Sequence, residues 1–549
     1  IRDQHRSRGL GDVYKRQIDT LADGQSLDYT ITEFPFFSFL LGDLHPHVLA
    51  LPFIVLSLSL CLNLFLSEDP PGIGWLRDRP LESLAVAFFL GSLAFINTWD
   101  FPMLAAVLGA VILAKSYATQ DGNLAKATAN AGLMFAPIIL LSIAAFLPFY
   151  LDFGSQATGI LPLRGNSTRP FLYFLVIGLF SFLSISLVLR QLWSLESGSS
   201  NLNGLDRQDQ PAATKRDSTA AVAIGISAVA PLVLWLVTVW IWALLSDGAA
   251  TEAREMVSRA IWVLPGLALA GIASHSTLRR YRLDTDAASV FPLILFTVAF
   301  LLIVGAELFF VADSFGGEFR RMNTVFKVYY QAWLLLGLVG AYSIYYWFSG
   351  PSPVRNTPTF TIWAQFRKGA NYLWIGVLVV LILTSMYYPV GAVLDRTGWL
   401  GQSNSQHNNT LDGLAFIKND RPGEYDAIQW LQNEAPWGRV AEATGSDYSE
   451  YGRISSSTGL PTILGWKGHE LQWRGSSKLY EGREEDVATI YGSESEDEVR
   501  RILEKYQVRY VYEGQREKTT YGTINLAHFD NLLRIAFTAQ DLIIYELIP

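Results

Sequence analysis

A short segment ahead of the first long apolar run gathers four ionisable side chains, Glu33, Asp43, His45 and His47. The chain has only 7 histidines, and two of them follow Asp43 at alternate positions. Carboxylate and imidazole groups at this spacing could ligate a divalent cation or form an acid–base set. We predict Asp43, with Glu33 as second candidate, as base or metal ligand, and His45 and His47 as ligands or orienting groups. The alternative is a helix N-terminus that Asp43 caps and Pro46 begins.

A second segment, residues 313–331, concentrates positive charge in Arg320, Arg321 and Lys327. Arginine binds phosphate through two parallel hydrogen bonds and lysine adds a point charge. We therefore predict that these three cations hold an anionic substrate. Ion pairs with Asp313 and Glu318, or contacts with lipid headgroups, are the alternatives.

Further candidates lie in two other short segments. In Asn97–Asp100 the carboxylate of Asp100 either caps a helix or contributes to the same site. Residues 455–475 are rich in glycine, tryptophan and polar side chains, a composition found both in binding loops and in ordinary irregular structure. Aromatic pairs such as Tyr329-Tyr330 are typical of the belt at a membrane surface.

The rest of the chain divides into an apolar part and a polar part. Hydrophobic residues make up 50% of the sequence and charged residues only 17%, below the roughly 25% of soluble domains. A helical span needs about 20 mostly apolar residues, and backbone groups in lipid must be bonded within the span. We predict about ten transmembrane helices, at 46–66, 82–97, 101–117, 131–150, 170–192, 221–246, 259–275, 288–311, 328–348 and 372–393.

The distribution of basic residues predicts the orientation. With the segment before Pro46 placed outside, the inner loops hold roughly twice as many lysines and arginines as the outer loops. This topology puts both ionisable segments and the C-terminal part on the outer side of the plasma membrane.

Residues 395–549 read as a soluble α/β domain. Residues 426–433 and 498–506 have helical spacing, and 439–443, 508–512, 532–537 and 542–547 read as strands. Alternating helices and strands joined by short links favour an α/β layer. We predict a transmembrane domain over 18–394. Residues 1–17 are basic, without apolar periodicity, and are excluded as a leader foreign to the fold.

Several function classes lack support in the sequence. The net charge of −8 argues against a nucleic-acid partner, and one cysteine provides neither a disulfide framework nor a cysteine metal site. Glycine-rich phosphate loops and the HExxH motif are missing from the sequence.

Four blocks of the sequence carry a family resemblance: EFPFFSFLLGDLHPHVLALPF, FINTWDFP, RMNTVFKVYYQAW and STGLPTILGWKGHELQWRG. Together the chain resembles the DUF2298, or YYY, membrane proteins of bacteria and archaea, from about Glu33 to its end. The N-terminal tyrosine-triplet stretch of that family is absent, which predicts a truncated chain.

The resemblance implies a GT-C-like glycosyltransferase. Such enzymes take a sugar from a polyprenyl-phosphate donor on the outer face, using a loop carboxylate and often a divalent metal, here Mg²⁺ or Mn²⁺. Their base usually lies in the first outer loop, which is missing here. Arg320, Arg321, Lys327 and Asp100 would then hold the donor. Trp466, His469 and Trp473 would bind a glycan, lipid or protein acceptor.

Two other classes of function remain open from the sequence. A transporter or flippase of lipid-linked or anionic solutes could use the same outer cations together with Glu307, which lies inside an apolar run. The C-terminal part could also be a binding module held by a membrane anchor.

Overall fold

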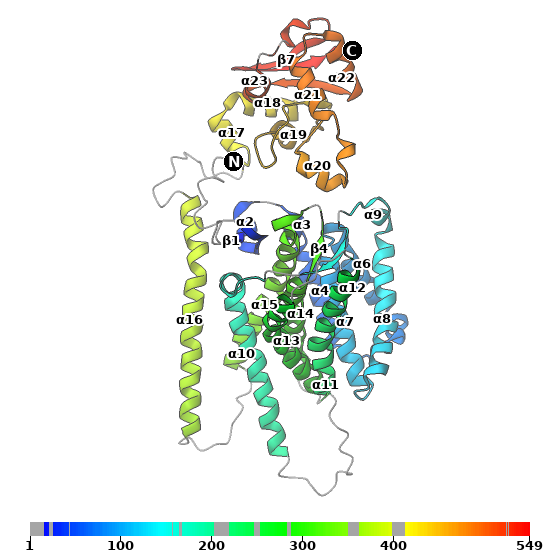
Figure 1. Cartoon of the computed structure of the whole chain (residues 1–549), viewed down its shortest axis with the longest axis vertical. Helices are drawn as coiled ribbons and strands as arrows, with labels where there is room; N and C mark the ends of the chain where they lie inside the picture. Colours follow the sequence, from blue (N-terminus) through cyan, green and yellow to red (C-terminus); the bar gives the residue numbers. More distant parts are fainter. Residues whose placement is uncertain are drawn as a thin grey trace. The chain divides into compact units, whose positions relative to one another are not determined.

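The computed structural model of the chain forms two compact units, one mainly of residues 9–153 and 157–393 and the other mainly of residues 394–549 (Figure 1). We refer to them as the helical unit and the C-terminal unit. The residues described are 16–20, 26–42, 44–155, 157–163, 167–202, 219–245, 253–282, 287–313, 315–349, 362–397, 412–522, 524 and 526–548.

Among the described residues of the helical unit, 8 helices are long and apolar enough to cross a membrane. They are α7 (Asp100–Thr119), α8 (Leu124–Ala145), α10 (Pro170–Leu202), the continuous run of α11 (Thr219–Ile224), the π-helical turn η2 (Gly225–Val229) and α12 (Ala230–Leu245), α13 (Ala253–Arg282), α14 (Ala287–Leu308), α15 (Met322–Ser349) and α16 (Ile362–Arg396). The first two predicted spans form shorter apolar helices, α4 (Leu51–Leu66) and α6 (Pro80–Ile96).

Short elements complete the helical unit at the ends of these helices. They are β1 (Arg16–Thr20), β2 (Ser26–Ile31), α2 (Pro35–Leu41), α3 (Pro46–Leu49), α5 (Ile73–Asp78), α9 (Leu147–Asp152), β3 (Gly159–Pro162), β4 (Phe309–Ala312) and the 3₁₀ turn η3 (Gly317–Phe319). The predicted foreign leader overlaps β1, because Arg16 and Gln17 pair with Ile31 and Thr30 of β2.

Helix α14 forms the centre of the helical unit. In its spanning segment 78% of the residues are buried inside the protein, whereas in that of α16 only 11% are buried. Helix α14 is apolar on all sides, as a helix enclosed by other helices must be. The helix packs against α13, α15, α7 and α4. The packing of α14 therefore fixes the position of its last residue, Leu308, where the following segments begin.

A two-stranded ribbon ties the end of α14 to the segment before α10. Strand β3 pairs antiparallel with β4, from Gly159 opposite Ala312 to Pro162 opposite Phe309. The pairing also brings Leu163 N within hydrogen-bonding distance of Leu308 O, at 2.8 Å. Segments about 150 residues apart in the sequence are therefore joined at one end of the helical unit.

The C-terminal unit is built on a mixed sheet in the order β5-β6-β8-β7. Strands β5 and β6 are parallel, and β8 is antiparallel to both β6 and β7. The elements are α17 (Ala415–Asp420), α18 (Pro422–Asn433), β5 (Arg439–Ala441), α19 (Arg453–Thr458), α20 (Lys467–Arg474), η4 (Ser477–Leu479), α21 (Arg483–Gly492), α22 (Glu496–Lys505), β6 (Val508–Glu513), α23 (Gln515–Tyr521), η5 (Leu526–His528), β7 (Leu533–Ala539) and β8 (Leu542–Leu547).

Helices cover both faces of this sheet. Ile428 and Leu431 of α18 pack with Ile544 of β8 on one face. On the other face, α21 and α22 pack against Tyr545 of the same strand. Successive residues of β8 thus point to opposite cores, as the period of two in a strand requires. The predicted helices and strands are present, with ends shifted by a few residues.

Glu517 joins the loops that follow the two parallel strands. Its carboxylate accepts hydrogen bonds from Ala443 N after β5, at 2.9 Å, and from Gly514 N after β6, at 3.0 Å. The side chain is only 2% exposed. Burial is the main cause that raises the pKa of Glu517 to about 7, and the nearby Glu442 carboxylate adds to it.

The close packing of α6 on α8 generates a first prediction. A Cβ on Gly91 would come within 2.5 Å of Ser142 O and 2.9 Å of the Phe146 ring, whereas Gly132 of α8 has open space. Gly91→Val should lower the apparent melting temperature in detergent by several degrees, because overpacking costs about 1–3 kcal/mol. Gly132→Val is the matched control, and an equal effect of both would contradict this packing.

The buried carboxyl of Glu517 generates a second prediction, on pH. Because the folded-state pKa of about 7 lies above the ordinary value of 4.5, the folded state holds the proton more tightly. The contribution of this group to the free energy of unfolding is fully present below about pH 4.5 and is lost as the pH rises to 7. We expect the difference in free energy of unfolding between wild type and Glu517→Gln to fall across this window by a few kcal/mol at most. The measurement is thermal unfolding at fixed ionic strength. A difference independent of pH would refute it.

Candidate functional site

Helix α15 presents two neighbouring tyrosines to two separate groups of polar side chains. Tyr329 and Tyr330 are each 1% exposed, so the predicted membrane-belt position is wrong for this pair. Tyr329 donates a hydrogen bond to Glu307, at 3.3 Å, while the ring of Tyr330 lies edge-on to His47, with 4.7 Å between centroids. We call the two groups the Lys327 cluster (Glu33, His47, Asp100, Lys327, Tyr330 and Gln331) and the Glu307 cluster (Thr168, Arg259, Glu307, Arg321 and Tyr329).

The Lys327 cluster assembles around one imidazole. His47 Nε2 lies 3.4 Å from Glu33 Oε2, and His47 Nδ1 lies 3.5 Å from Lys327 Nζ. The carboxylates of Glu33 and Asp100 both attract the Lys327 ammonium. One cation therefore lies among two carboxylates and an imidazole in a largely buried setting, where charge interactions are stronger than in water.

Asp100 contributes to the cluster from the start of α7. It is the first residue of this helix, one position after the N-cap Trp99, and it is 1% exposed. Oδ1 accepts a hydrogen bond from Gln331 Nε2 at 2.7 Å, whereas Oδ2 is buried with no hydrogen-bond partner among the described residues. The Asp100 side chain therefore lies within the Lys327 cluster, and its role in a site stays a prediction.

The short helix α3 places the two histidines side by side. Pro46 is its first residue and His45 precedes it as the N-cap, so the predicted proline start is present. The two imidazole rings are 5.4 Å apart, with His47 buried and His45 exposed. Asp43 lies outside the described residues, and neither its catalytic role nor its capping role is tested.

The Glu307 cluster is a network of hydrogen bonds around one buried carboxylate. Glu307 is 3% exposed and accepts hydrogen bonds from Arg321 Nη2 at 2.7 Å and from Thr168 N at 3.0 Å. Thr168 Oγ1 donates to the same carboxylate, and Arg259 Nη1 donates to Glu307 O. An ion pair at this depth requires such added partners, because removing both charges from water is costly.

The three predicted phosphate-binding cations therefore separate. Lys327 lies in the cluster named after it, whereas Arg321 is 1% exposed and paired with Glu307. Arg320 lies beside it on the half-buried turn after η3. The predicted alternative of pairing with Asp313 is not the one found for Arg321. Asp313 instead accepts hydrogen bonds from Asn323 Nδ2 at 2.7 Å and Phe315 N at 2.9 Å.

The predicted acceptor residues lie in the C-terminal unit. Trp466 and His469 are in edge-to-face contact, with centroids 5.1 Å apart, and Tyr448 contacts both rings. Trp466 Nε1 also donates to Tyr451 O, at 2.6 Å. The side chain of Trp473 lies outside the described residues.

The sequence profile of a family described as "Uncharacterized membrane protein (DUF2298)" matches residues 14–336. The chain belongs to this family. The match ends inside α15, at residue 336; it covers both clusters and includes residues 14–17 of the segment predicted to be foreign. It ends before the C-terminal unit, so the fourth sequence block of the resemblance lies beyond it. A comparison with curated proteins finds no match.

No sequence motif marked several residues of the two clusters. Gln331 and Tyr330 lie four and three residues after Lys327, so they follow it on one face of α15. This spacing was the available signal. Thr168 and Arg259 reach Glu307 only through the packing of α10, α13 and α14, for which the sequence carries no local signal.

The buried ion pair of Glu307 and Arg321 predicts a large coupling between the two charges. Arg321→Met should destabilise this DUF2298 protein by about 3–5 kcal/mol, because it leaves a buried carboxylate without its cation. The double variant Glu307→Gln/Arg321→Met should cost clearly less than the sum of the two single variants. The measurement is unfolding by SDS titration from mild detergent, with exposed Lys126→Met as the control. Purely additive effects would show that the pair is not coupled.

Proposed function

We propose that this membrane protein is a glycosyltransferase of the GT-C type, which transfers a sugar from a polyprenyl-phosphate donor to an extracytoplasmic acceptor. The observation that carries the proposal is the Lys327 cluster, in which a largely buried ammonium lies with two carboxylates and an imidazole at one end of a bundle of apolar helices. Such a site offers a cation to an anionic leaving group and carboxylates to an incoming hydroxyl.

The proposed reaction assigns a task to each group. The acceptor hydroxyl attacks C1 of the sugar, the bond from C1 to the phosphate oxygen breaks, and the proton passes to Glu33. Polyprenyl phosphate leaves with its added negative charge next to Lys327. His47 holds Glu33 and Lys327 in place through its two ring nitrogens, and Asp100 Oδ2 accepts a hydrogen bond from a donor hydroxyl.

Other predicted residues keep proposed roles of their own. Arg320 is proposed to contact the donor phosphate beside Lys327. Arg321 has no direct role in this proposal, because its guanidinium is committed to Glu307. Trp466 and His469 are proposed acceptor contacts. We propose the plasma membrane as the location, with the C-terminal unit on the outer side.

A divalent metal at His47 does not fit the described residues. One ring nitrogen faces Glu33, and the other lies 3.5 Å from the Lys327 ammonium, whose charge would repel a metal cation. Among the part of the chain that is described, no group of three or more candidate ligands could hold a metal ion. Asp43, the first of the predicted metal ligands, lies outside the described residues, so the divalent metal stays a prediction. The proposed reaction assigns the offset of the phosphate charge to the Lys327 ammonium.

The central test of the proposal is Lys327→Met. Native mass spectrometry in lipid nanodiscs with a panel of polyprenyl-phosphate hexoses should show one retained donor for wild type. Sugar transfer should fall by about 100-fold or more in the variant, because a charge that stabilises the leaving group is lost. Lys368→Met, an exposed lysine of α16, is the matched control and should behave as wild type.

The same proteins reconstituted in sealed proteoliposomes separate transfer from transport. A donor retained and moved across the bilayer without any bond breaking would favour a flippase of lipid-linked solutes. Full transfer activity in Lys327→Met would refute the assigned role of the ammonium. A folded wild-type protein that retains no donor from the panel would refute the proposed donor class.

A further inference from the structure

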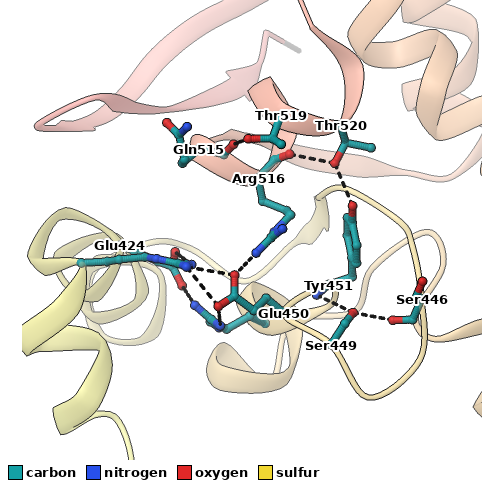
Figure 2. Close-up of polar contacts among 11 residues, drawn as sticks. Glu424, Ser446, Ser449, Glu450, Tyr451, Gln515, Arg516, Thr519 and Thr520 are labelled. Carbon is teal, nitrogen blue, oxygen red and sulfur yellow. Dashed lines mark hydrogen bonds and ion pairs between the residues drawn. The ribbon is translucent and has the colours of Figure 1, made fainter. Parts of the chain in front are cut away.

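Three arginines of the C-terminal unit converge on one carboxylate, that of Glu450 (Figure 2). Arg421 Nη2 lies 3.0 and 2.9 Å from its two oxygens, and Arg453 Nη2 lies 3.0 Å from Oε1. Arg516 Nη2 forms a third ion pair with Oε2. The arginines come from three separate segments: the residue before α18, the start of α19 and α23. Glu450 is thus held as an oxyanion ligand would be, by several guanidinium groups at once.

A second carboxylate balances part of this positive charge. Glu424 of α18 accepts hydrogen bonds from Arg453 Nη1 at 2.9 Å and from Arg421 Nη1 at 3.5 Å. The guanidinium of Arg516 lies over the Tyr451 ring, 5.3 Å from the centroid. Without Glu450, Arg421 and Arg453 would keep Glu424 as a partner, whereas Arg516 would lose its ion pair with Glu450.

The pocket that contains Arg421, Arg453, Arg516 and Glu450 lies where the two parallel strands end. Glu442 and Ala443 follow β5, Gly514 to Glu517 follow β6, and residues of both segments line the same pocket. In open α/β sheets the crevice outside the carboxyl ends of the parallel strands is the usual place for a ligand. Here the remaining space is about 20 Å³, room for roughly one water molecule. The pocket has the position of a ligand site, and its own side chains fill it.

The segment that carries Glu450 is a connection and not part of the sheet. It runs from β5 to α19 and ends at Gly452, whose φ of +73° is a left-handed conformation that favours glycine. Tyr448 on the same segment is 64% exposed. Asp447 fastens it by accepting the Gly468 N–H at 3.1 Å. Glu450 thus lies on a connection between elements, and its release from the arginines would not require the strands or α18 to move.

We propose that the pocket formed by Arg421, Arg453 and Arg516 is a binding site for a ligand oxyanion, a phosphate or a carboxylate, and that Glu450 is a built-in occupant which the ligand displaces. The three guanidinium groups exchange one set of charge-assisted hydrogen bonds for another, and Glu450 becomes exposed to water. The proposal does not rest on the proposed sugar transfer, because it uses no residue of the Lys327 cluster.

Equilibrium dialysis of the full chain in nanodiscs tests the proposal with two labelled probes, inorganic phosphate and glucuronate. Glu450→Gln should bind at least one probe about tenfold more tightly than wild type, because the competing carboxylate is removed. Adding Arg516→Met to that variant should abolish the gain. Glu434→Gln, which removes an exposed carboxylate from the same unit, is the matched control and should bind as wild type.

The outcomes divide clearly. Tighter binding of phosphate alone identifies a phosphate site, and tighter binding of glucuronate alone identifies a site for acidic sugars. No gain with either probe in a Glu450→Gln protein of wild-type melting temperature would overturn the proposal. If that variant does not fold, wild type is compared with Arg516→Met. Weaker probe binding in Arg516→Met supports the proposal, and equal or undetectable binding in both overturns it.

Discussion

The buried pair of Glu307 and Arg321 is the interaction on which the arrangement of the helical unit depends. A carboxylate and a guanidinium at 2.7 Å, each almost without solvent contact, are stable only if their remaining hydrogen-bonding groups find partners. Those partners come from the segment before α10, from α13 and from α15. The ion pair therefore joins four parts of the chain at one end of the central helix α14, and the β3–β4 ribbon joins the same region through backbone bonds.

The position of the Lys327 cluster follows from that junction. Arg321 immediately precedes α15, so the ion pair sets where this helix begins. Tyr329 then faces Glu307 and the adjacent Tyr330 faces His47, because successive residues of a helix point about 100° apart. Lys327 and Gln331, one turn apart, reach His47 and Asp100 on the same side as Tyr330. The Glu307 cluster thus fixes the position of the Lys327 cluster. In the Lys327 cluster, Asp100 Oδ2 is a buried acceptor with no hydrogen-bond partner among the described residues.

The buried and partly buried charges of the C-terminal unit have two kinds of partner, backbone amides and arginine side chains. Its core is an ordinary two-faced sheet, and its polar groups collect where the parallel strands end. There Glu517 is satisfied by backbone amides from both loops, while three arginines share carboxylates on flexible side chains. Backbone amides cannot easily exchange partners without local unfolding, but an arginine can accept a different oxyanion. The first set stabilises the strand ends, and the second is suited to exchange.

The sequence by itself determined the class of the protein and the identity of most of its elements. Apolar runs of span length predicted the helices, and periodicity predicted α18, α22 and the four strands of the C-terminal sheet, because burial imposes the same spacing wherever it occurs. It also marked Glu33, His47, Asp100 and Lys327 as candidates, since charge near a membrane is costly.

Tertiary structure alone decided which cations share a site. Arg320, Arg321 and Lys327 are close in sequence, yet Arg321 is held by Glu307 and Lys327 lies beside His47, because helix phase and the packing of α14 against its neighbours send them to different partners. Likewise, nothing local indicates that Arg421, Arg453 and Arg516 meet at Glu450, because contacts between distant segments depend on how the chain closes on itself.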